Sequence, residues 1–432
     1  MARKMKDSGI EWIGEIPEGW RTINPKALFT QRKDKAQKGE RQLTSSQQYG
    51  ILYQDDYMEL TGSKVVTVEK DFDILKHVEA GDFVISMRSF QGGLEYSTNS
   101  GAISSAYVML VPNLELVYPR FYRWLLKSSV YIDALQRTTN MVRDGQAMRY
   151  SNFAQVRLFT LPLDEQKSRA DFLDLECSSI DKILFKTRSS IEEYKKLKQA
   201  VITQAVTKSV RGEREMKDSG VEWIGEIPKK WNRCKLNSIC TFINGDRSKN
   251  YPSSEDFQDI GIPFIGADSL NGFFVDTYSA RHISPAKYAS MGGLKITQGD
   301  ILYTLRGSTI GKNAIANFND GTIASSLVGI RVKSPFLASS SFLFYWLNSL
   351  NEFVQRDLCI NGSTAPNLSA ENVAQFFIYI PDITEQHEIA DYLDAKCAEI
   401  DKLIAKKEQL VKELDSYKKS LIYEVVTGKR EV

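Results

Sequence analysis

The chain is 432 residues long, carries a formal net charge of +2 and contains 42% hydrophobic residues. Its length predicts two or three domains, and its apolar content is sufficient for a core in each. A net charge so close to zero excludes a bulk polycation, and without an apolar run of about 18 residues we expect no membrane span. The start of the chain lacks a signal-peptide pattern, and its five cysteines form no Cys-x-x-Cys pair, so we expect a cytoplasmic protein.

Two sequence boxes each occur twice. Residues 5–20 read MKDSGIEWIGEIPEGW and residues 216–231 read MKDSGVEWIGEIPKKW, with 13 of 16 positions identical. Residues 165–185 and 385–405 share 10 of 21 positions, and each of these boxes begins shortly after a proline. The chain is therefore predicted to contain two copies of one plan, which is a short box, a variable region and a long helix.

The variable regions, 21–160 and 232–380, are predicted to be mixed α/β. Each contains a Gly-Asp turn followed by a strand-like run, an arginine (Arg88 or Arg306), a glycine-rich turn, a short aromatic helix and a polar loop. Their sequences are otherwise dissimilar. One scaffold is thus expected to carry two different surfaces.

Long helices are expected at 165–208 and 385–427, because neither stretch contains Pro or Gly. Apolar residues recur there at alternating steps of four and three, interrupted by Thr187 and Lys198 in the first helix and by Lys407 and Lys418 in the second, which is the seam of a coiled coil. A surface helix packed on its own domain is the alternative, but two seams of matching register favour pairing with each other. The seam residues are Leu173, Cys177, Ile180, Leu184, Ile191, Tyr194, Val201 and Ala205, and Leu393, Cys397, Ile400, Ile404, Val411, Leu414, Leu421 and Val425.

Catalytic motifs are missing from the sequence. The nearest approach to a phosphate-binding P-loop, 307–313, is one residue short and lacks the metal-binding hydroxyl. The three histidines have no metal-ligand spacing, so no metal site is expected. No Asn-Pro-Pro-aromatic loop of the kind that amino-methyltransferases use is present. The chain is predicted to be non-catalytic.

Local charge differs from the total. Region 21–160 has 18 Lys and Arg against 14 Asp and Glu, whereas region 231–380 has 12 against 11. Six basic residues crowd the stretch 26–41, which is either a solvated face or a set of phosphate contacts. These residues are Lys26, Arg32, Lys33, Lys35, Lys38 and Arg41.

Reading bases requires side chains that make paired hydrogen bonds from a loop or helix in a groove, such as Arg to guanine and Asn or Gln to adenine. Each candidate here is individually compatible with an ordinary surface or turn residue. Their recurrence at equivalent places in both halves favours a shared role. The candidate DNA-binding residues are Lys33, Lys35, Arg88, Gln91, Gln146, Arg149, Arg306, Ser308, Thr309, Lys312, Ser363 and Asn367.

The layout resembles the specificity subunits of Type I restriction–modification systems over essentially the whole chain. The resemblance is carried by the two boxes, by the Glu-Gln openings of both helices, by their Val-Thr endings and by one polar loop. The residues are DSGIEWIGEIPEGW and DSGVEWIGEIPKKW, Pro162 with Glu165-Gln166, Pro381 with Glu385-Gln386, Ala205-Val206-Thr207, Val425-Val426-Thr427-Gly428, and the loop 362–368.

The resemblance implies an α/β fold in which two mixed α/β target-recognition domains are joined by two long helices. These helices would form an antiparallel coiled coil with internal pseudo-twofold symmetry. The segments would be residues 1–164 (box and first domain), 165–215 (first helix), 216–384 (box and second domain) and 385–432 (second helix).

The resemblance also implies a non-catalytic subunit that binds a bipartite, asymmetric double-stranded DNA site, with one half-site per domain. The helices would set the spacer and dock two modification subunits, and restriction subunits would join them. S-adenosylmethionine, ATP and Mg²⁺ would be bound by those partners and none by this chain. No membrane partner is implied.

Two departures from the family pattern affect the first half. Its helix ends Val206-Thr207-Lys208 where the second ends Val426-Thr427-Gly428, so it lacks the expected capping glycine. Its loop 144–149 shares only Gly145 with the pattern.

Two alternatives come from other classes. A coiled-coil scaffold for protein partners would bind without regard to DNA sequence and with little dependence on salt. A self-sufficient methyltransferase would bind S-adenosylmethionine by itself.

Overall fold

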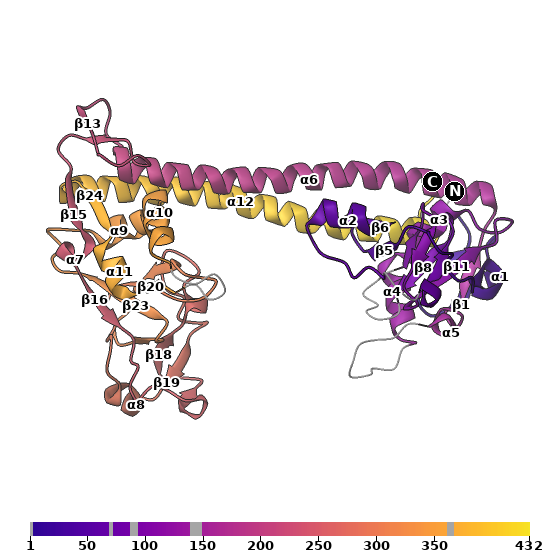
Figure 1. Ribbon diagram of the computed structural model, residues 1–432, viewed down its shortest axis with the longest axis horizontal. Helices are drawn as coiled ribbons and strands as arrows, with labels where there is room; N and C mark the ends of the chain where they lie inside the picture. The colour runs from indigo at the N-terminus through magenta and orange to yellow at the C-terminus, as the bar shows by residue number, and fades with distance from the viewer. Residues whose placement is uncertain (1–2, 69–71, 87–93, 139–148, 361–366) are drawn as a thin grey trace. The chain divides into compact units, whose positions relative to one another are not determined.

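The computed structural model describes residues 3–68, 72–86, 94–138, 149–360 and 367–432. The chain divides into two compact units (Figure 1). Unit 1 comprises residues 1–188 and 409–432, and unit 2 comprises residues 189–408. The boundary between the units cuts both long helices. Among the described residues, no helix is both long and apolar enough to span a membrane.

Unit 1 is built on a four-stranded antiparallel sheet. Its strands, in sheet order, are β4 (Phe29–Arg32), β11 (Tyr107–Pro112), β8 (Phe83–Ser86) and β9 (Leu94–Tyr96). Phe29 lies at the centre of the core, with its ring 5.4 Å from that of Phe83 and 5.5 Å from that of Tyr122. The helices are α1 (Pro25–Leu28), α2 (Gln54–Thr61), α3 (Pro119–Leu126), α4 (Ser129–Gln136) and α5 (Tyr150–Phe153).

The remaining strands of unit 1 form small antiparallel pairs around this sheet. They are β1 (Met5–Ile10) with β2 (Gly14–Pro17), β3 (Arg21–Ile23) with β12 (Leu158–Thr160), β5 (Leu43–Ser46) with β6 (Gly50–Tyr53), and β7 (Lys76–Val78) with β10 (Gly101–Ile103).

Unit 2 repeats the same sheet. Its strands, in the matching order, are β16 (Cys240–Asn244), β23 (Leu327–Val332), β20 (Ile301–Thr304) and β21 (Asn313–Ile315). The helices are α7 (Leu236–Ile239), α8 (Pro285–Ser290), α9 (Ser340–Leu347), α10 (Leu350–Cys359) and α11 (Ala370–Gln375). The pairs are β13 (Met216–Asp218) with β14 (Glu226–Pro228), and β15 (Asn232–Lys235) with β24 (Phe377–Ile380). The expectation that one scaffold occurs twice is confirmed.

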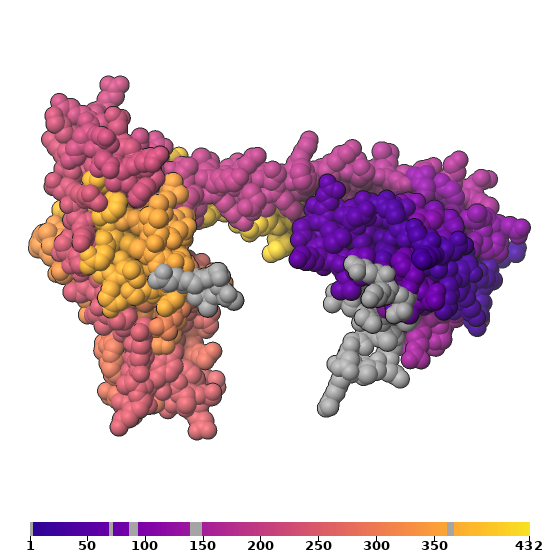
Figure 2. Space-filling view, in the orientation of Figure 1, coloured from indigo at the N-terminus to yellow at the C-terminus, as the bar shows by residue number. Residues whose placement is uncertain are grey.

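Unit 2 also contains a second four-stranded sheet. Its order is β17 (Phe257–Gln258), β19 (Arg281–Ile283), β18 (Ile262–Ile265) and β22 (Thr322–Ile323), and β18 and β22 run parallel. This sheet and α8 form the end of unit 2 that is farthest from the long helices (Figures 1 and 2).

The long helices are α6 (Leu163–Lys208) and α12 (Ile383–Val426). In unit 1 they run antiparallel, because Lys418 lies 2.6 Å from Asp181 and Arg188 lies 3.1 Å from Asp415. In unit 2 the same direction follows from two contacts, because Nζ of Lys198 lies 2.7 Å from Asp401 and Nζ of Lys407 lies 5.6 Å from the centre of the Tyr194 ring. Many of the predicted seam residues are buried, including Leu173, Cys177, Ile180, Leu184, Leu393, Cys397, Ile400, Leu421 and Val425. The predicted antiparallel pairing is therefore present within each unit.

The repeated boxes attach each domain to its helix. Trp20 is fully buried, and its Nε1 donates a hydrogen bond of 3.1 Å to Glu165 at the start of α6. Trp231 is equally buried and donates a hydrogen bond of 3.4 Å to Glu385 at the start of α12. A buried indole N–H requires such an acceptor. The repeated Trp and Glu residues of the two boxes thus have a structural role.

The glutamine that follows each of these glutamates is also fully buried. Gln166 donates to the carbonyl oxygens of Leu116 and Leu161 at 2.8 and 2.9 Å and accepts the N–H of Tyr118. Gln386 makes the matching bonds to Leu337, Pro381 and Ser339. One amide side chain thereby satisfies three backbone groups where the chain enters the aromatic helix and the long helix.

Candidate nucleic-acid interface

In the basic stretch 26–41 of unit 1, the arginines form ion pairs and the lysines are exposed to solvent. Arg32 at the end of β4 lies 2.6 Å from the buried Asp82 and 3.0 Å from Asp34, and these carboxylates raise the pKa of Arg32. Arg41 pairs with Asp55 at 2.6 Å. Arg41 is exposed, as are Lys26, Lys33, Lys35 and Lys38, and Lys35 also donates to the carbonyl oxygen of Asp73. Both arginines therefore form ion pairs within the unit, and the four lysines are exposed to solvent.

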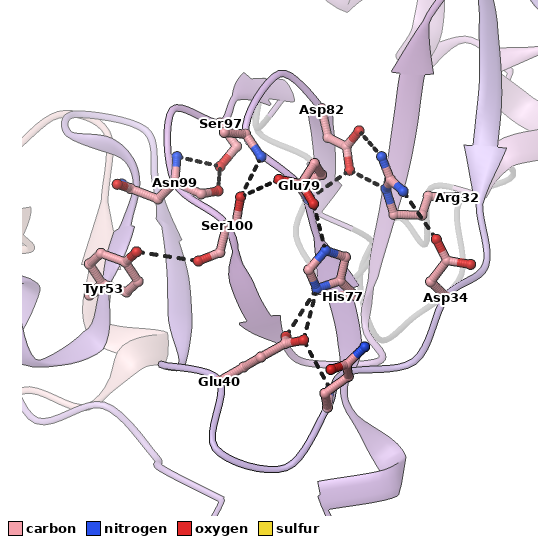
Figure 3. Close-up of polar contacts among 12 residues, drawn as sticks. Arg32, Asp34, Glu40, Tyr53, His77, Glu79, Asp82, Ser97, Asn99 and Ser100 are labelled. Atoms are coloured by element: carbon pink, nitrogen blue, oxygen red, sulfur yellow. Dashed lines mark hydrogen bonds and ion pairs between the residues drawn. The ribbon is translucent and has the colours of Figure 1, made fainter.

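A polar network holds the second half of this stretch (Figure 3). The ring of His77 on β7 contacts a carboxylate at each nitrogen, with Nδ1 3.0 Å from Glu40 and Nε2 3.1 Å from Glu79. Burial alone would lower the pKa of His77, but the two carboxylates outweigh it and raise that pKa. Ser100 donates a 2.6 Å hydrogen bond to Glu79 and completes the link to the neighbouring turn.

In unit 2 the candidate residues lie on the hairpin between β20 and β21, residues 305–312. Arg306, Ser308 and Thr309 are exposed at its tip. Gly307 and Gly311 have φ angles of +85° and +88°, which side chains with a Cβ rarely adopt. The stretch 307–313 thus joins two antiparallel strands, whereas a P-loop would lead from a strand into a helix.

The structure brings two separately predicted segments together at this hairpin. Arg306 forms an isolated antiparallel bridge with Asn367, and the N–H of Leu368 donates to the carbonyl oxygen of Leu305 at 2.9 Å. Both Arg306 and Asn367 are exposed. A combined surface of this kind is suited to paired hydrogen bonding with bases.

The other candidates have mixed positions. The ammonium of Lys312 is engaged with the carbonyl oxygen of Ala267 at 3.0 Å and with Asn271 at 2.7 Å. Arg149 is exposed at the N-cap of α5. Arg88, Gln91, Gln146 and Ser363 lie outside the described residues. Contact with DNA stays a prediction for all twelve.

Sequence reasoning missed a buried cluster beneath the unit 2 hairpin. Tyr303 on β20 donates a hydrogen bond to Glu352 on α10, and Arg356 lies 3.3 Å from the other oxygen of Glu352. Tyr303 and Glu352 are fully buried. Burial raises the pKa of Glu352 to about 7 despite the nearby guanidinium of Arg356. The i, i+4 spacing of Glu352 and Arg356 was the available signal, but it is also typical of a solvated helix face.

The comparisons with known proteins bear on the same region. Residues 228–413 match the family model described as the Type I restriction modification DNA specificity domain. This part of the chain is therefore similar to the specificity domains of that family. The matched range extends from the end of the second box, through the sheet and hairpin of unit 2, into α12.

Curated relatives carry the same description. The Type I restriction enzyme EcoBI specificity subunit of Escherichia coli is 28% identical over 270 residues, which is 60% of this chain and 55% of that protein. The StySPI specificity subunit of Salmonella potsdam is 23% identical over 212 residues, which is 47% of this chain and 44% of that protein. The alignments span about half of each relative's length. The resemblance to Type I specificity subunits is confirmed.

Solved structures share the fold along nearly the whole chain. A chain of a type I R-M system, studied for its complex assembly and conformational transition, has a TM-score of 0.68 at 16% identity and covers 96% of this chain and 99% of its own. The HsdS subunit from Thermoanaerobacter tengcongensis has a TM-score of 0.50 at 16% identity, with 96% and 98% covered. The predicted fold class is confirmed.

Proposed function

We propose that this chain is the DNA-recognition subunit of a Type I restriction–modification enzyme and reads a bipartite double-stranded site. The specificity domain at 228–413 is the observation that carries the proposal. The occurrence of the same sheet order in unit 1 supports a second reader. Each unit would read one half-site, with base contacts from exposed loops and phosphate contacts from lysines such as Lys33.

In this proposal the paired helices α6 and α12 set the unread spacer between the half-sites and dock two modification subunits. Those subunits would bring S-adenosylmethionine, and restriction subunits would bring ATP and Mg²⁺. The chain itself would bind no cofactor and catalyse no reaction, and the assembly would work in the cytoplasm. Linkage of two weak half-site contacts on one chain gives tight binding to the whole site.

The decisive experiment is to map methylated motifs in the host genome, with and without this gene. A split adenine-methylation motif should disappear on deletion and return when the gene is restored. The purified chain should neither methylate nor cleave DNA without its partner subunits. If no split motif depends on the gene, the proposal is wrong.

The spacer role has its own test. Insertion of four residues between Lys186 and Thr187 of α6 should lengthen the spacer in the methylated motif, because each added helical residue extends the rod by about 1.5 Å. Both half-site sequences should remain unchanged. An altered half-site after this insertion would contradict the assignment of reading to the two domains.

A further inference from the structure

The side chain of Arg356 on α10 contacts the backbone of the hairpin 305–312 of unit 2. Nη1 of Arg356 on α10 lies 3.4 Å from the carbonyl oxygen of Ile310 and donates a hydrogen bond to it. The guanidinium lies directly against Gly311, so that a Cβ on Gly311 would overlap it. The guanidinium of Arg356 therefore occupies space that only a glycine at position 311 leaves open, and the φ of +88° independently favours glycine there.

Arg356 is itself held by buried partners. Glu352, one helical turn earlier on α10, lies 3.3 Å from Nη1 and is in turn hydrogen-bonded by the hydroxyl of Tyr303. The ring of Phe353 lies 4.8 Å beneath the guanidinium. With Glu352 and Tyr303 fully buried and its own side chain 15% exposed, Arg356 has little freedom to leave the hairpin.

The same helix leads into the second segment of the candidate surface. The last turn of α10 ends at Cys359, and Asn367 and Leu368 return to the hairpin through their backbone contacts with Arg306 and Leu305. A change at Arg356 would therefore alter the hairpin and the residues paired with it together.

Unit 1 provides an internal control for this cluster. The turn between α3 and α4 makes the same hydrogen bond as the turn between α9 and α10. Ser128 donates to the carbonyl oxygen of Leu125 at 2.7 Å, and Ser349 donates to that of Trp346 at 2.7 Å. Counting onward from these serines, Tyr131 occupies the position of Glu352, and Leu135 occupies that of Arg356.

The unit 1 residue that corresponds to Tyr303 is found by aligning the Gly-Asp turns. Asp82 aligns with Asp300, and Ile85 therefore aligns with Tyr303. Ile85, Tyr131 and Leu135 are fully buried. The scaffold thus accommodates uncharged side chains at these positions, although the hydroxyl of Tyr131 has no hydrogen-bond partner within the described part of unit 1. Since burying a charge is costly, the charged set in unit 2 favours a role outside the core, and Arg356 contacts the hairpin.

We propose that Arg356, fixed by Glu352 and Tyr303, is a positioning residue that sets the hairpin 305–312 in its base-reading conformation. The inference rests on the proposed function, because it assigns a role in reading one half-site. It predicts that Arg356 controls discrimination between bases without touching DNA. The first unit uses no such residue at the equivalent position.

The test uses the full chain assembled with its modification subunits. Methylation rates are measured on duplexes that carry each single base change in either half-site. Arg356→Gln should reduce discrimination at least tenfold in one half-site and leave the other unchanged. The affected half-site should be the one that Arg306→Ala also affects, since Arg306 lies on the hairpin.

Three further variants separate positioning from stability. Arg356→Lys keeps the charge beside Glu352 and should restore part of the discrimination. The triple change Tyr303→Ile, Glu352→Tyr and Arg356→Leu installs the residues of unit 1, and it should keep the melting temperature while losing discrimination. Tyr345→Phe removes a hydrogen bond to Asp394 elsewhere in unit 2 and should leave discrimination intact.

The outcomes are distinguishable. If the wild-type complex methylates no split site, the proposed function itself fails. If it does so and the folded Arg356 variants discriminate as well as wild type, the positioning role is wrong. The same conclusion follows if both half-sites lose discrimination equally, or if Arg356 and Arg306 affect different half-sites.

Discussion

In both units an arginine donates a hydrogen bond to the buried aspartate of the Gly-Asp turn, but the arginine lies on a different strand in each unit. In unit 1, Asp82 accepts a hydrogen bond of 2.6 Å from Arg32 on β4. In unit 2, Asp300 accepts one of 2.7 Å from Arg331 on β23. Each aspartate also accepts a backbone N–H three residues before it. The fold requires a guanidinium at this place in space, and the comparison shows that two sequence positions can supply it.

The ends of the long helices differ in a similar way. Helix α12 is followed by Gly428 with φ +77°, whereas α6 is followed by Ser209 with φ +73°. The first helix therefore adopts the expected left-handed termination without the capping glycine. The hydroxyl of Ser209 donates to Glu385, and this bond offsets part of the strain of a left-handed serine.

The largest expected effect tests whether the two boxes are equivalent. Trp20→Ala and Trp231→Ala should each destabilise their own unit by about 3–5 kcal/mol, because each removes a large buried side chain. Hydrogen exchange read by mass spectrometry should lose protection only in peptides of the unit that carries the change. Trp223→Ala is the control, since Trp223 is 38% exposed and should cost far less. An equal loss of hydrogen-exchange protection in both units after one substitution would show that the two units do not unfold independently.

A second prediction separates the units by pH. Burial raises the pKa of Glu352 in the folded state to about 7, so its contribution to stability is complete below its usual pKa of 4.5 and is lost as pH rises through 7. Unit 2 should lose on the order of 3 kcal/mol between pH 5 and 8, and Glu352→Gln should abolish that dependence. A wild-type unit 2 of constant stability over this range would contradict the burial argument.

Unit 1 should depend on pH through a different group. Hydrogen bonds to Glu40 and Glu79 raise the pKa of His77 above 6.5, so its stabilising contribution is complete below 6.5 and is lost as pH rises through the folded pKa. His77→Gln should flatten the pH profile of protection in unit 1 and leave that of unit 2 unchanged. The reverse pattern would mean that the two carboxylates do not favour the imidazolium.

A third comparison concerns the buried aspartates. Arg32→Gln and Arg331→Gln should each cost about 1–3 kcal/mol, less than for a fully buried pair because both arginines are partly exposed. Adding Asp82→Asn or Asp300→Asn should restore part of the loss, since the unpaired charge is then removed. Urea denaturation of the single and double variants measures this coupling, and simple additivity would refute it.

The smallest effect concerns the helix ends. Ser209→Gly should change stability by less than about 1 kcal/mol, because relief of the positive φ and loss of the Glu385 bond oppose each other. Gly428→Ala should cost more, since its Cβ would lie 2.5 Å from Cγ of Pro17. Thermal unfolding of both variants gives the ranking. A costlier change at Ser209 would show that its hydroxyl matters more than its backbone.

Much of the fold could be predicted because its signals repeat. The regular spacing of apolar residues predicts the seams of α6 and α12, and the near-identical sequences of residues 5–20 and 216–231 reveal the repeated box. The second sheet of unit 2 could not be predicted. In the described part of unit 1 the corresponding contact is a parallel bridge between Gln42 and Ala102, and the parallel pair of β18 with β22 joins segments more than fifty residues apart.

The candidate site was less predictable, because it depends on contacts between distant segments. The bridge between Arg306 and Asn367 joins two loops that are distant in the sequence. Lys312 looks like a free cation in the sequence, yet its ammonium is bound by Ala267 and Asn271. The proposed positioning role of Arg356 depends on its hydrogen bond to the carbonyl oxygen of Ile310. The residues around Arg356 in the sequence do not predict this contact.

The composition of unit 1 has a consequence for protein synthesis. Residues 189–408 form unit 2 as a continuous segment, but unit 1 needs residues 409–432 to cover Leu173, Cys177 and Ile180 of α6. At translation rates of about 5–20 residues per second, roughly 12–50 s pass between the emergence of residue 188 and that of residue 432. During this interval an apolar helix face is left open on the ribosome. We expect unit 2 to fold first, and nascent chains stalled before residue 409 to recruit chaperones through this face.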